Sequence, residues 1–421
     1  VYQRSLLNCV DFTAEYCALT SDDKSIALTN AAHDLSVYDV FGMLYTGGSI
    51  AVPDEDDRRD PQRWAELISR RKVTFWNSVP AMQEMLMEYL SPEQTEQLSS
   101  LRTIILGGDY VKTSLAKKIF AAIPSVKLIS IGGPTETTIW NIMHTVTEDD
   151  IENGVIPYGK PISNSKYHIL GENLDELPLG VTGMMYCSGV QLARGYCGNA
   201  KETDKKFFIH PRTGERLYET GDMGKYAENG EIIFMGRRDN QIKIHGKRIE
   251  LGGINSVIGK IEGITRSAVL VMGQKIVAFC SGTASEKQII SCIGSELPEY
   301  MIPDSIILLD TIPLKSNGKT DNKALTEIYE GMEHIEETAV TESKDRSDAL
   351  LEKVSAMFCE VLNCKAESED DFFELGGDSM TAITLLNKIR ELSPQYGLRD
   401  FYKDHCVLNV VNTLKNSGIE N

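Results

Sequence analysis

A glycine turn followed by hydroxyls and a carboxylate is the first segment of this chain that could do chemistry. Gly132-Gly133 closes a predicted strand, and Pro134, Thr135 and Glu136 follow directly. Such a turn can bring backbone amides close to phosphate oxygens, and a carboxylate beside it can hold Mg²⁺. In isolation, an ordinary strand-to-helix loop explains the segment equally well, because Gly-Pro and Thr are common turn and cap residues.

Three further segments add polar groups in a fixed order. Asp222 ends the segment 218–222 after a predicted strand, where it could accept from ribose hydroxyls, although a turn aspartate is the better reading of that segment alone. The segments 236–244 and 313–321 complete the set. Four such segments in this order are not expected by chance.

Ser379 is a separate candidate, because it follows the run 370–378 and leads into a predicted helix. Serine is a preferred N-cap residue, and an N-cap is the simplest reading of this position alone.

The elements that must position these groups differ along the chain. From Ile26 to Pro134, short β-rich runs alternate with helical patterns, which predicts a parallel sheet with loops gathered at the strand ends. Ligands favour such ends. After Gly180 the pattern changes to short strands and tight turns, with hairpins predicted at 225–235 and 268–280 and a helix at 249–261.

The C-terminal part is predicted to be an acidic linker followed by a helical bundle. Residues 327–348 are acidic and polar and cannot bury enough surface to form a core. Apolar residues at helical spacing follow at 350–361, 380–386 and 407–414.

Composition excludes several classes of protein. The chain has 421 residues, of which 43 are Lys or Arg and 61 are Asp or Glu, giving a formal charge of −18. This disfavours a duplex nucleic acid partner, which is held mainly through phosphate charge. No apolar run is long enough to span a membrane, and the start resembles no signal peptide, so we expect a cytoplasmic protein and no membrane partner. The nine cysteines show no C-x-x-C spacing, which disfavours a zinc site, and the start without Met indicates part of something longer.

These motifs together resemble the adenylation domain of nonribosomal peptide synthetases, within the adenylate-forming superfamily, fused to a peptidyl carrier domain. The resemblance covers residues 1–325 and includes 182–186 and 193–196. It implies an α/β fold in which a partial adenylate-forming core has a mostly parallel sheet and a β-rich segment. A small mobile α+β lid domain and a C-terminal four-helix carrier bundle follow. The implied domains are the core at 1–238, the lid at 239–325, the acidic linker at 326–347 and the carrier at 348–421.

The resemblance also assigns roles by position. ATP would be bound by Gly133, Pro134, Thr135, Asp222 and Arg237, with Asp222 at the ribose and Thr135 near the α-phosphate. Glu136 would coordinate Mg²⁺. Lys319, on a loop of the lid, would bridge the substrate carboxylate and the α-phosphate, and Asp239 would be the hinge about which the lid swings between adenylation and thioester formation.

The sequence departs from the family pattern in places. The loop that clamps the β- and γ-phosphates is expected upstream of Val1 and is not in this sequence. Gly132 stands where many members carry an aromatic residue that stacks on adenine. His245 and Gly253 replace a more usual Arg and Glu.

The amino-acid pocket can be aligned in the same way, beginning with Asp34, which would bind the ammonium group of the substrate. Tyr38 and Trp140 would narrow an otherwise apolar pocket, and Asn77 would supply one polar group. This pattern resembles cysteine-activating modules, although Gly107 replaces an expected serine. Serine, glycine and alanine remain open, because one polar contact discriminates by only a few kcal/mol. The aligned positions are Asp34, Leu35, Tyr38, Asn77, Ile105, Gly107, Ile131, Ile139 and Trp140, with Lys319 closing the set.

The run Phe372-Phe373-Glu374-Leu375-Gly376-Gly377-Asp378-Ser379 is similar to the carrier-protein signature. By that match, Ser379 would bear a 4′-phosphopantetheine attached by a phosphopantetheinyl transferase, and the arm's thiol would accept the aminoacyl group. A flexible linker would raise the effective concentration of this acceptor at the active site. The implied partners are the amino acid, that transferase, and neighbouring condensation or heterocyclisation domains.

Two competing functions remain. A ligase that releases a CoA thioester needs no tethered arm, so the signature at Ser379 disfavours it. A catalytically decayed docking module is disfavoured by the presence of Asp222, Glu136 and Lys319.

Overall fold

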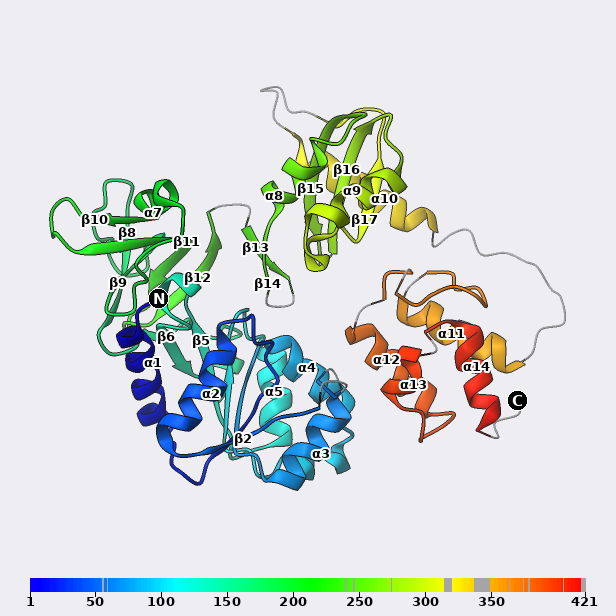
Figure 1. The fold of residues 1–421 in the computed structure, drawn as a ribbon, viewed down its shortest axis with the longest axis horizontal. Helices are drawn as coiled ribbons and strands as arrows, with labels where there is room; N and C mark the ends of the chain where they lie inside the picture. Colours follow the sequence, from blue (N-terminus) through cyan, green and yellow to red (C-terminus); the bar gives the residue numbers. More distant parts are fainter. Residues whose placement is uncertain are drawn as a thin grey trace. The chain divides into compact units, whose positions relative to one another are not determined.

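The computed structural model (Figure 1) divides into two units, Val1–Gly246 and Lys247–Asn421, which are described separately below. It describes every residue except 55, 56, 59, 239, 240, 245, 246, 274, 314–319, 337–348, 363, 374, 378, 404 and 418–421.

The first unit begins with helices alternating with short strands and continues with longer strands. In chain order its elements are α1 (Gln3–Tyr16), β1 (Lys24–Ile26), α2 (Leu35–Thr46), β2 (Ser49–Ala51), α3 (Pro61–Arg71), β3 (Phe75–Ser78), α4 (Pro80–Tyr89), η2 (Pro92–Leu98), β4 (Thr103–Leu106), α5 (Thr113–Ala122), β5 (Lys127–Gly132), η3 (Thr135–Thr137), β6 (Ile142–Thr145), α6 (Glu148–Glu152), β7 (Lys160–Pro161), β8 (Ser165–Leu170), β9 (Gly183–Gly189), α7 (Ala200–Lys206), β10 (Phe207–Ile209), β11 (Arg216–Tyr226), β12 (Ile232–Arg237) and β13 (Gln241–Ile244).

A seven-stranded sheet forms the base of this unit within the described residues, in the order β2-β1-β3-β4-β5-β6-β7. Neighbours from β2 to β5 pair in parallel, whereas β6 and β7 join antiparallel. The central strands β3 and β4 are buried along their whole length, as expected where helices cover both faces of a parallel sheet. Parallel pairing places the carboxyl ends of β3, β4 and β5 at one edge, where polar loops follow them.

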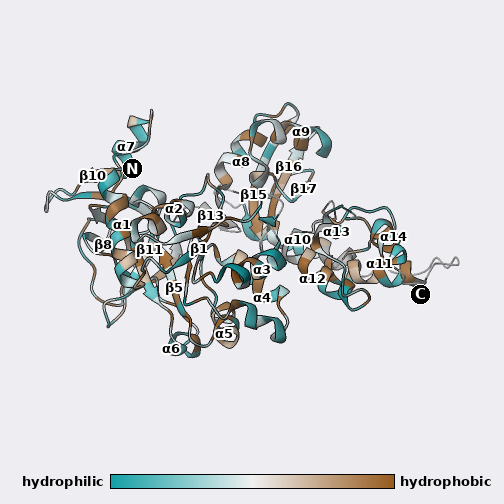
Figure 2. Cartoon of the chain, turned by 60° about the horizontal axis from the view of Figure 1, so that its bottom comes forward, coloured by the Kyte–Doolittle hydropathy of each residue, from teal (hydrophilic) through white to brown (hydrophobic). Residues whose placement is uncertain are grey.

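The two faces of the sheet pack against different helices. Phe75 and Ile105 lie in one buried cluster with residues of α1 and α2, whereas Trp76 points the other way and contacts Trp64 of α3 with ring centroids 6.0 Å apart. Successive strand residues face opposite sides of a sheet, which explains this alternation. Helix α3 shows why such helices form here: Asp60 caps its start by accepting from the backbone N–H of Gln62. Figure 2 shows hydrophobic residues along the strands, while α3 and α4 mix hydrophilic and hydrophobic positions.

The second sheet of this unit is antiparallel, in the order β10-β11-β9-β8 with β12 paired to β11. Its pairing of Tyr226 with Ile232 confirms the hairpin predicted at 225–235. A second cluster, which includes Tyr167, Cys187 and Tyr218, fills its inner side.

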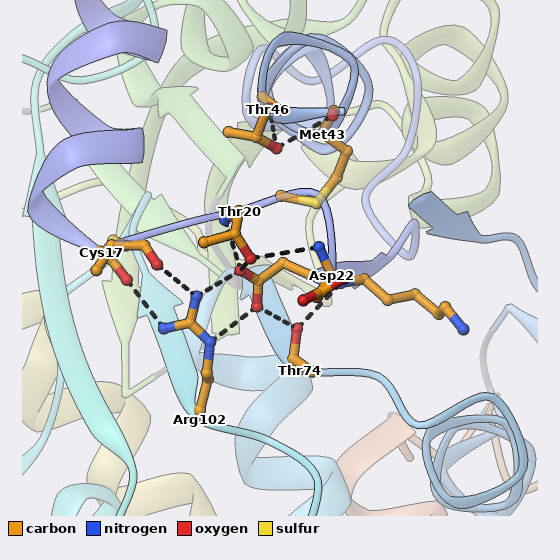
Figure 3. A network of polar contacts seen from close by, with 11 residues as sticks. Cys17, Thr20, Asp22, Met43, Thr46, Thr74 and Arg102 are labelled. Carbon is orange, nitrogen blue, oxygen red and sulfur yellow. Dashed lines mark hydrogen bonds and ion pairs between the residues drawn. The ribbon is translucent and has the colours of Figure 1, made fainter. Parts of the chain in front are cut away.

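An ion pair with a buried carboxylate ties the end of α1 to the sheet (Figure 3). The carboxylate of Asp23, with 4% of its side chain exposed, accepts from Arg102 at 2.5 Å and from Thr74 Oγ1 at 2.7 Å. Arg102 also donates to the carbonyl oxygens of Cys17 and Ala18 at 3.0 and 2.8 Å. Burial alone would raise the pKa of Asp23, but the hydrogen bonds from Arg102 and Thr74 hold it below its ordinary value. This network therefore stabilises the fold above the usual aspartate pKa and weakens as the pH falls through the lowered value.

We expect Arg102→Ala to lower the free energy of unfolding by about 2–3 kcal/mol, because it removes the cation paired with the buried carboxylate of Asp23 and the donor to two carbonyl groups. The matched control is Arg63→Ala, since Arg63 forms an exposed pair with Glu66 and should change stability by less than about 0.5 kcal/mol. The midpoint of the first thermal unfolding transition measures both. Equal shifts for the two variants would contradict the assigned role of Arg102.

The second unit contains a small α+β part. Its elements are β14 (Lys247–Glu250), α8 (Leu251–Ile258), β15 (Ile264–Met272), β16 (Lys275–Gly282), α9 (Glu286–Glu296), η4 (Glu299–Met301), β17 (Ser305–Leu308) and α10 (Asn322–Glu336). The hairpin of β15 and β16 agrees with the prediction for 268–280, and β17 adds in parallel to β16. The helix predicted at 249–261 starts two residues later than expected, because Ile249, a buried β-branched residue, belongs to the strand β14, which ends at Glu250. Helix α10 includes residues 326–336, which composition assigned to the linker, because Ile328 and Tyr329 pack with Leu325 against the hairpin.

The rest of the second unit is a helical bundle. It consists of α11 (Ala349–Leu362), α12 (Ser379–Arg390), α13 (Leu398–Lys403) and α14 (Val407–Asn416). Buried apolar residues from all four helices, among them Phe358, Leu386, Phe401 and Val410, form its core. The predicted fold class is confirmed, whereas the predicted domain boundaries stay predictions. Among the described residues, no helix is both long and apolar enough to cross a bilayer.

Candidate active site

The glycine turn after β5 has a backbone that only particular residues tolerate. Gly133 has φ +136°, and a Cβ there would stand 2.6 Å from Asn141 Oδ1, so a side chain is excluded. Thr138 and Ile139 both have positive φ, at 60° and 63°, which is a strained conformation for a β-branched residue. Thr138 Oγ1 donates to the carbonyl oxygen of Gln191 at 2.8 Å and helps to hold this bend. Such strain is concentrated at functional sites.

The turn brings two predicted site residues into direct contact. Thr135, at the start of η3, donates from Oγ1 to Asp34 Oδ2 at 2.6 Å. Asp34 directly precedes α2. The residue predicted to bind an ammonium group and the residue predicted to approach a phosphate therefore lie side by side.

Glu136 follows in the same short helix and is 9% exposed. It accepts a hydrogen bond from the hydroxyl of Tyr196 at 2.6 Å, and its carbonyl oxygen accepts from the backbone N–H of Ala193 at 2.8 Å. In the sequence, residues 193–196 were only one part of the resemblance to the family. The role of Tyr196 in orienting the Glu136 carboxylate was therefore missed.

The predicted ribose site lies on the second sheet. Asp222 of β11 is paired in register with Arg237 of β12, and their side chains form an ion pair. Arg237 also donates to the carbonyl oxygen of Thr220 at 3.2 Å. The β-bulge between Asp222 and Gly224 is the kind of irregularity that re-aims side chains beside active sites. An anchored carboxylate of this kind is suited to accept hydrogen bonds from hydroxyl groups.

Most predicted substrate-pocket positions lie in one buried cluster. Tyr38 and Trp140 pack with ring centroids 4.9 Å apart. Gly107 follows β4, and a Cβ there would stand 2.5 Å from Ile131 Cγ1, so Ile131 occupies the space that a serine at 107 would need. The apolar pocket positions in the cluster are Leu35, Tyr38, Ile105, Ile131, Ile139 and Trp140.

Asn77, at the end of β3, is the polar pocket position, and its partner was missed. Its amide nitrogen donates to Asp39 Oδ1 at 2.9 Å and to the carbonyl oxygen of Leu35 at 3.0 Å. Two acceptors on one side fix the orientation of the amide. Among the described side chains, Asn77 Oδ1, Asp39 Oδ2 and the Tyr38 hydroxyl are buried atoms without a hydrogen-bond partner. Unsatisfied polar atoms of this kind are uncommon in native interiors.

Asp39 and Thr13 complete the surroundings of this cluster. Asp39 is 1% exposed, and burial raises its pKa to about 8 although the hydrogen bond from Asn77 lowers it. Asp39 lies in the predicted block 33–39, four residues after Leu35 on the same helical face, so helical spacing could have found it. Thr13 accepts from the indole of Trp140 at 3.1 Å, and no local pattern marks it.

We expect Asp39→Asn to raise the unfolding temperature at alkaline pH. Because the folded-state pKa of Asp39 is raised, the folded protein binds a proton that the unfolded chain does not between about pH 4 and pH 8. The free energy of unfolding therefore falls as the pH rises through that window. The variant removes this loss, by on the order of 5 kcal/mol at about pH 9, and changes little at about pH 4. The exposed Asp22→Asn is the matched control, and parallel pH profiles for the parent and Asp39→Asn would refute this explanation.

Ser379 is the first residue of α12, and its side chain is outside the described part. The glycines before it fit tightly: Gly376 has φ +88°, and a Cβ at Gly377 would overlap the ring of Phe372, which is fully buried against Phe401. The signature therefore fixes the loop that leads into the helix.

Two predicted site residues lie outside the described residues. These are Lys319, in the segment 314–319, and Asp239. Their roles stay predictions. In the described part of the chain, no group of three or more His, Cys, Asp or Glu residues is arranged to hold a metal ion.

Comparison with protein families finds two matching segments of the chain. Residues 1–197 match the AMP-binding enzymes, and residues 352–414 match the phosphopantetheine attachment site. Bacitracin synthase 1 of Bacillus licheniformis is 35% identical over 413 residues, covering 94% of this chain and 8% of the relative. The anguibactin system regulator of Vibrio anguillarum is 33% identical over 405 residues, covering 92% of this chain and 38% of the relative. The chain thus spans well under half the length of these relatives.

Solved structures show the same fold. The structure of holo-PA1221, described as a nonribosomal peptide synthetase protein containing adenylation and carrier domains, has a TM-score of 0.78 and 25% identity, covering 94% of this chain and 66% of that one. The adenylation domain AlmE of Vibrio cholerae, in complex with glycyl-adenosine-5′-phosphate, has a TM-score of 0.70 and 27% identity, covering 79% of this chain and 63% of that one. The chain therefore belongs to the adenylation and carrier proteins of nonribosomal peptide synthesis, with an AMP-binding domain followed by a phosphopantetheine carrier domain.

Proposed function

We propose that the chain uses ATP to activate an amino acid as aminoacyl-AMP and then transfers the aminoacyl group to its own carrier domain at Ser379. The observation that carries this proposal is the 2.6 Å contact between Thr135 and Asp34. If Asp34 binds the ammonium group of an amino acid, the carboxylate on the same carbon lies close to Thr135, where an α-phosphate would approach. Adenylate formation requires these two reactants to meet in this way.

The other side chains have roles that fit this reaction. Asp222, anchored by Arg237, accepts hydrogen bonds from the ribose hydroxyls. Gly133, which has no room for a Cβ beside Asn141, allows the tight turn that would bring backbone amides toward the phosphates. Lys319 would neutralise the charge that develops between the carboxylate and the α-phosphate.

Glu136 is suited to hold Mg²⁺. Its carboxylate is a hard oxygen ligand that Tyr196 orients, and Mg²⁺ is commonly bound by one or two protein carboxylates together with substrate phosphates. When bound, the ion would neutralise phosphate charge.

Within this function, we infer that the substrate is a small amino acid with a weakly polar side chain, and cysteine fits best. Tyr38 and Trp140 limit the length of the side chain. Asn77 Oδ1, buried without a hydrogen-bond partner, is positioned to accept from a thiol or hydroxyl. Alanine and glycine would leave that acceptor unsatisfied, whereas serine would satisfy it.

An amino-acid-dependent ATP–pyrophosphate exchange panel on the full-length protein tests this specificity. We expect cysteine to be preferred, with serine next. In Asn77→Ala the preference for cysteine over alanine should fall by about 10- to 100-fold, whereas Asn164→Ala, at a loop outside the predicted pocket, should keep it. A preference for a bulky aromatic amino acid or an aryl acid would overturn the assignment.

The acceptor is proposed to be the carrier domain of the same chain. Its match at residues 352–414 favours a tethered acceptor over free CoA, because a covalently linked carrier gains effective concentration without new contacts. A phosphopantetheinyl transferase would modify Ser379, and when attached the group supplies a thiol. Neighbouring condensation or heterocyclisation domains would then use the loaded carrier.

A further inference from the structure

The side chain of Tyr158 fills the space beside Gly132. A Cβ at Gly132 would overlap ring carbons of Tyr158 and would stand 2.6 Å from its hydroxyl oxygen. Gly132 ends β5, directly before the predicted phosphate turn. The ring that borders this position therefore comes from a segment 26 residues farther along the chain, between α6 and β7.

The backbone of this segment is held firmly to the second sheet. The N–H of Tyr158 donates to the carbonyl oxygen of Ile232 at 2.8 Å, and Ile232 N–H donates to Gly159 at 2.8 Å. Gly159 has φ +107°, and a Cβ there would overlap the carbonyl of Met143. Only glycine fits at position 159. The backbone on the C-terminal side of Tyr158 is therefore fixed in position.

The ring is equally well positioned. It packs edge-on against Tyr167 with centroids 6.0 Å apart and lies 5.9 Å from Phe234, which is 38% exposed. Tyr158 itself is only partly buried. Burial raises the pKa of the Tyr158 hydroxyl, and the nearby carboxylate of Asp222 raises it further. The ring therefore lies within electrostatic reach of the proposed ribose site and borders the phosphate turn.

We propose that Tyr158 forms the aromatic contact for the base of the nucleotide, in the place left open by the missing side chain of Gly132. This inference rests on the proposed function. In a nucleotide whose ribose is held by Asp222, the base is one glycosidic bond away from the ribose and lies close to the residues that surround Asp222, such as Tyr158. A partly exposed aromatic ring is a surface on which a base stacks. Gly132 and Tyr158 then act together: the glycine leaves space for the aromatic ring, and Tyr158, from another segment of the chain, supplies that ring.

The test is binding of a fluorescent adenine-analogue triphosphate to the full-length protein, because stacking on tyrosine quenches such fluorophores. Tyr158→Phe keeps the ring and should keep both the quench and the affinity. Tyr158→Ala should lose the quench and weaken the affinity about tenfold. The matched control is Tyr45→Ala, which removes an exposed ring at the far end of α2 and should leave binding unchanged.

A swap of positions sharpens the test. Gly132→Tyr alone should weaken binding, because the new ring overlaps Tyr158. The double variant Gly132→Tyr with Tyr158→Ala should recover affinity to within about threefold of the parent, because a single ring is restored.

If Tyr158→Ala binds and quenches like the parent while Asp222→Ala loses binding, the role of Tyr158 is wrong and the nucleotide site stands. If Asp222→Ala also binds normally, the proposed nucleotide site itself fails. Thermal unfolding of each variant separates loss of fold from loss of contact, and failure of the double variant to recover when both single variants fold would also overturn the inference.

Discussion

Replacing Ser379 by alanine is expected to abolish loading of the carrier domain while leaving amino-acid-dependent pyrophosphate exchange unchanged. Ser379 begins α12, and the preceding turn is fixed by Gly377, which has no room for a side chain beside Phe372. A hydroxyl at this one position is the proposed point of attachment, so its removal leaves no substitute. The residues assigned to adenylation, among them Asp34, Asp222 and Lys319, lie outside the carrier bundle, so that step should continue.

Intact-protein mass spectrometry after incubation with a phosphopantetheinyl transferase and CoA measures this effect. The control is Ser417→Ala, which removes an exposed hydroxyl at the end of α14 and should be modified like the parent. Unchanged modification of the Ser379→Ala variant would show that another residue carries the arm. A loss of exchange activity in the same variant would contradict the separation of the two steps.

Lys319→Ala is expected to reduce adenylate formation by about 10³-fold, since a lysine aimed at developing charge is worth several kcal/mol in a site that excludes water. Transfer from an aminoacyl adenylate supplied from outside should fall far less, because that step no longer forms a bond to the α-phosphate. Pyrophosphate exchange measures the first step, and loading from synthetic adenylate measures the second.

Lys323→Ala is the matched control for this experiment. Lys323 lies four residues away on α10, and its side chain is 86% exposed, so its removal should affect neither step. Equal losses in both steps for Lys319→Ala would mean that the lysine is needed for structure and would contradict its assigned role.

Local patterns were sufficient for most of the fold. Alternating β-rich and helical segments predicted the parallel sheet, because helices that cover both faces of a sheet leave a regular hydrophobic pattern. The hairpin at β15 and β16 was predicted from its turn. Helix α13 was missed, because six residues are too few for a helical period to be visible. The helical pattern of residues 326–336 was also missed, because acidic residues on the exposed face of α10 mask the apolar residues Ile328 and Tyr329.

The candidate site was only partly accessible from sequence. Motifs singled out Asp34, Thr135 and Asp222, because their neighbours in the chain are distinctive. The contacts of Glu136 with Tyr196 and of Gly132 with Tyr158 join residues far apart in sequence. Such pairs are set by tertiary packing, which one sequence does not display. A missing side chain could be read from the sequence, but the residue that fills its place could not.

Loading of the carrier by its own adenylation domain is the central claim, and it can be measured directly. The full-length holo protein is incubated with cysteine, Mg²⁺ and ATP, digested, and the peptide that contains Ser379 is weighed by mass spectrometry. We predict an added cysteinyl group on that peptide that depends on ATP and disappears in Asp222→Ala. An unchanged peptide in a protein that carries the arm, or the same addition without ATP, would contradict the account.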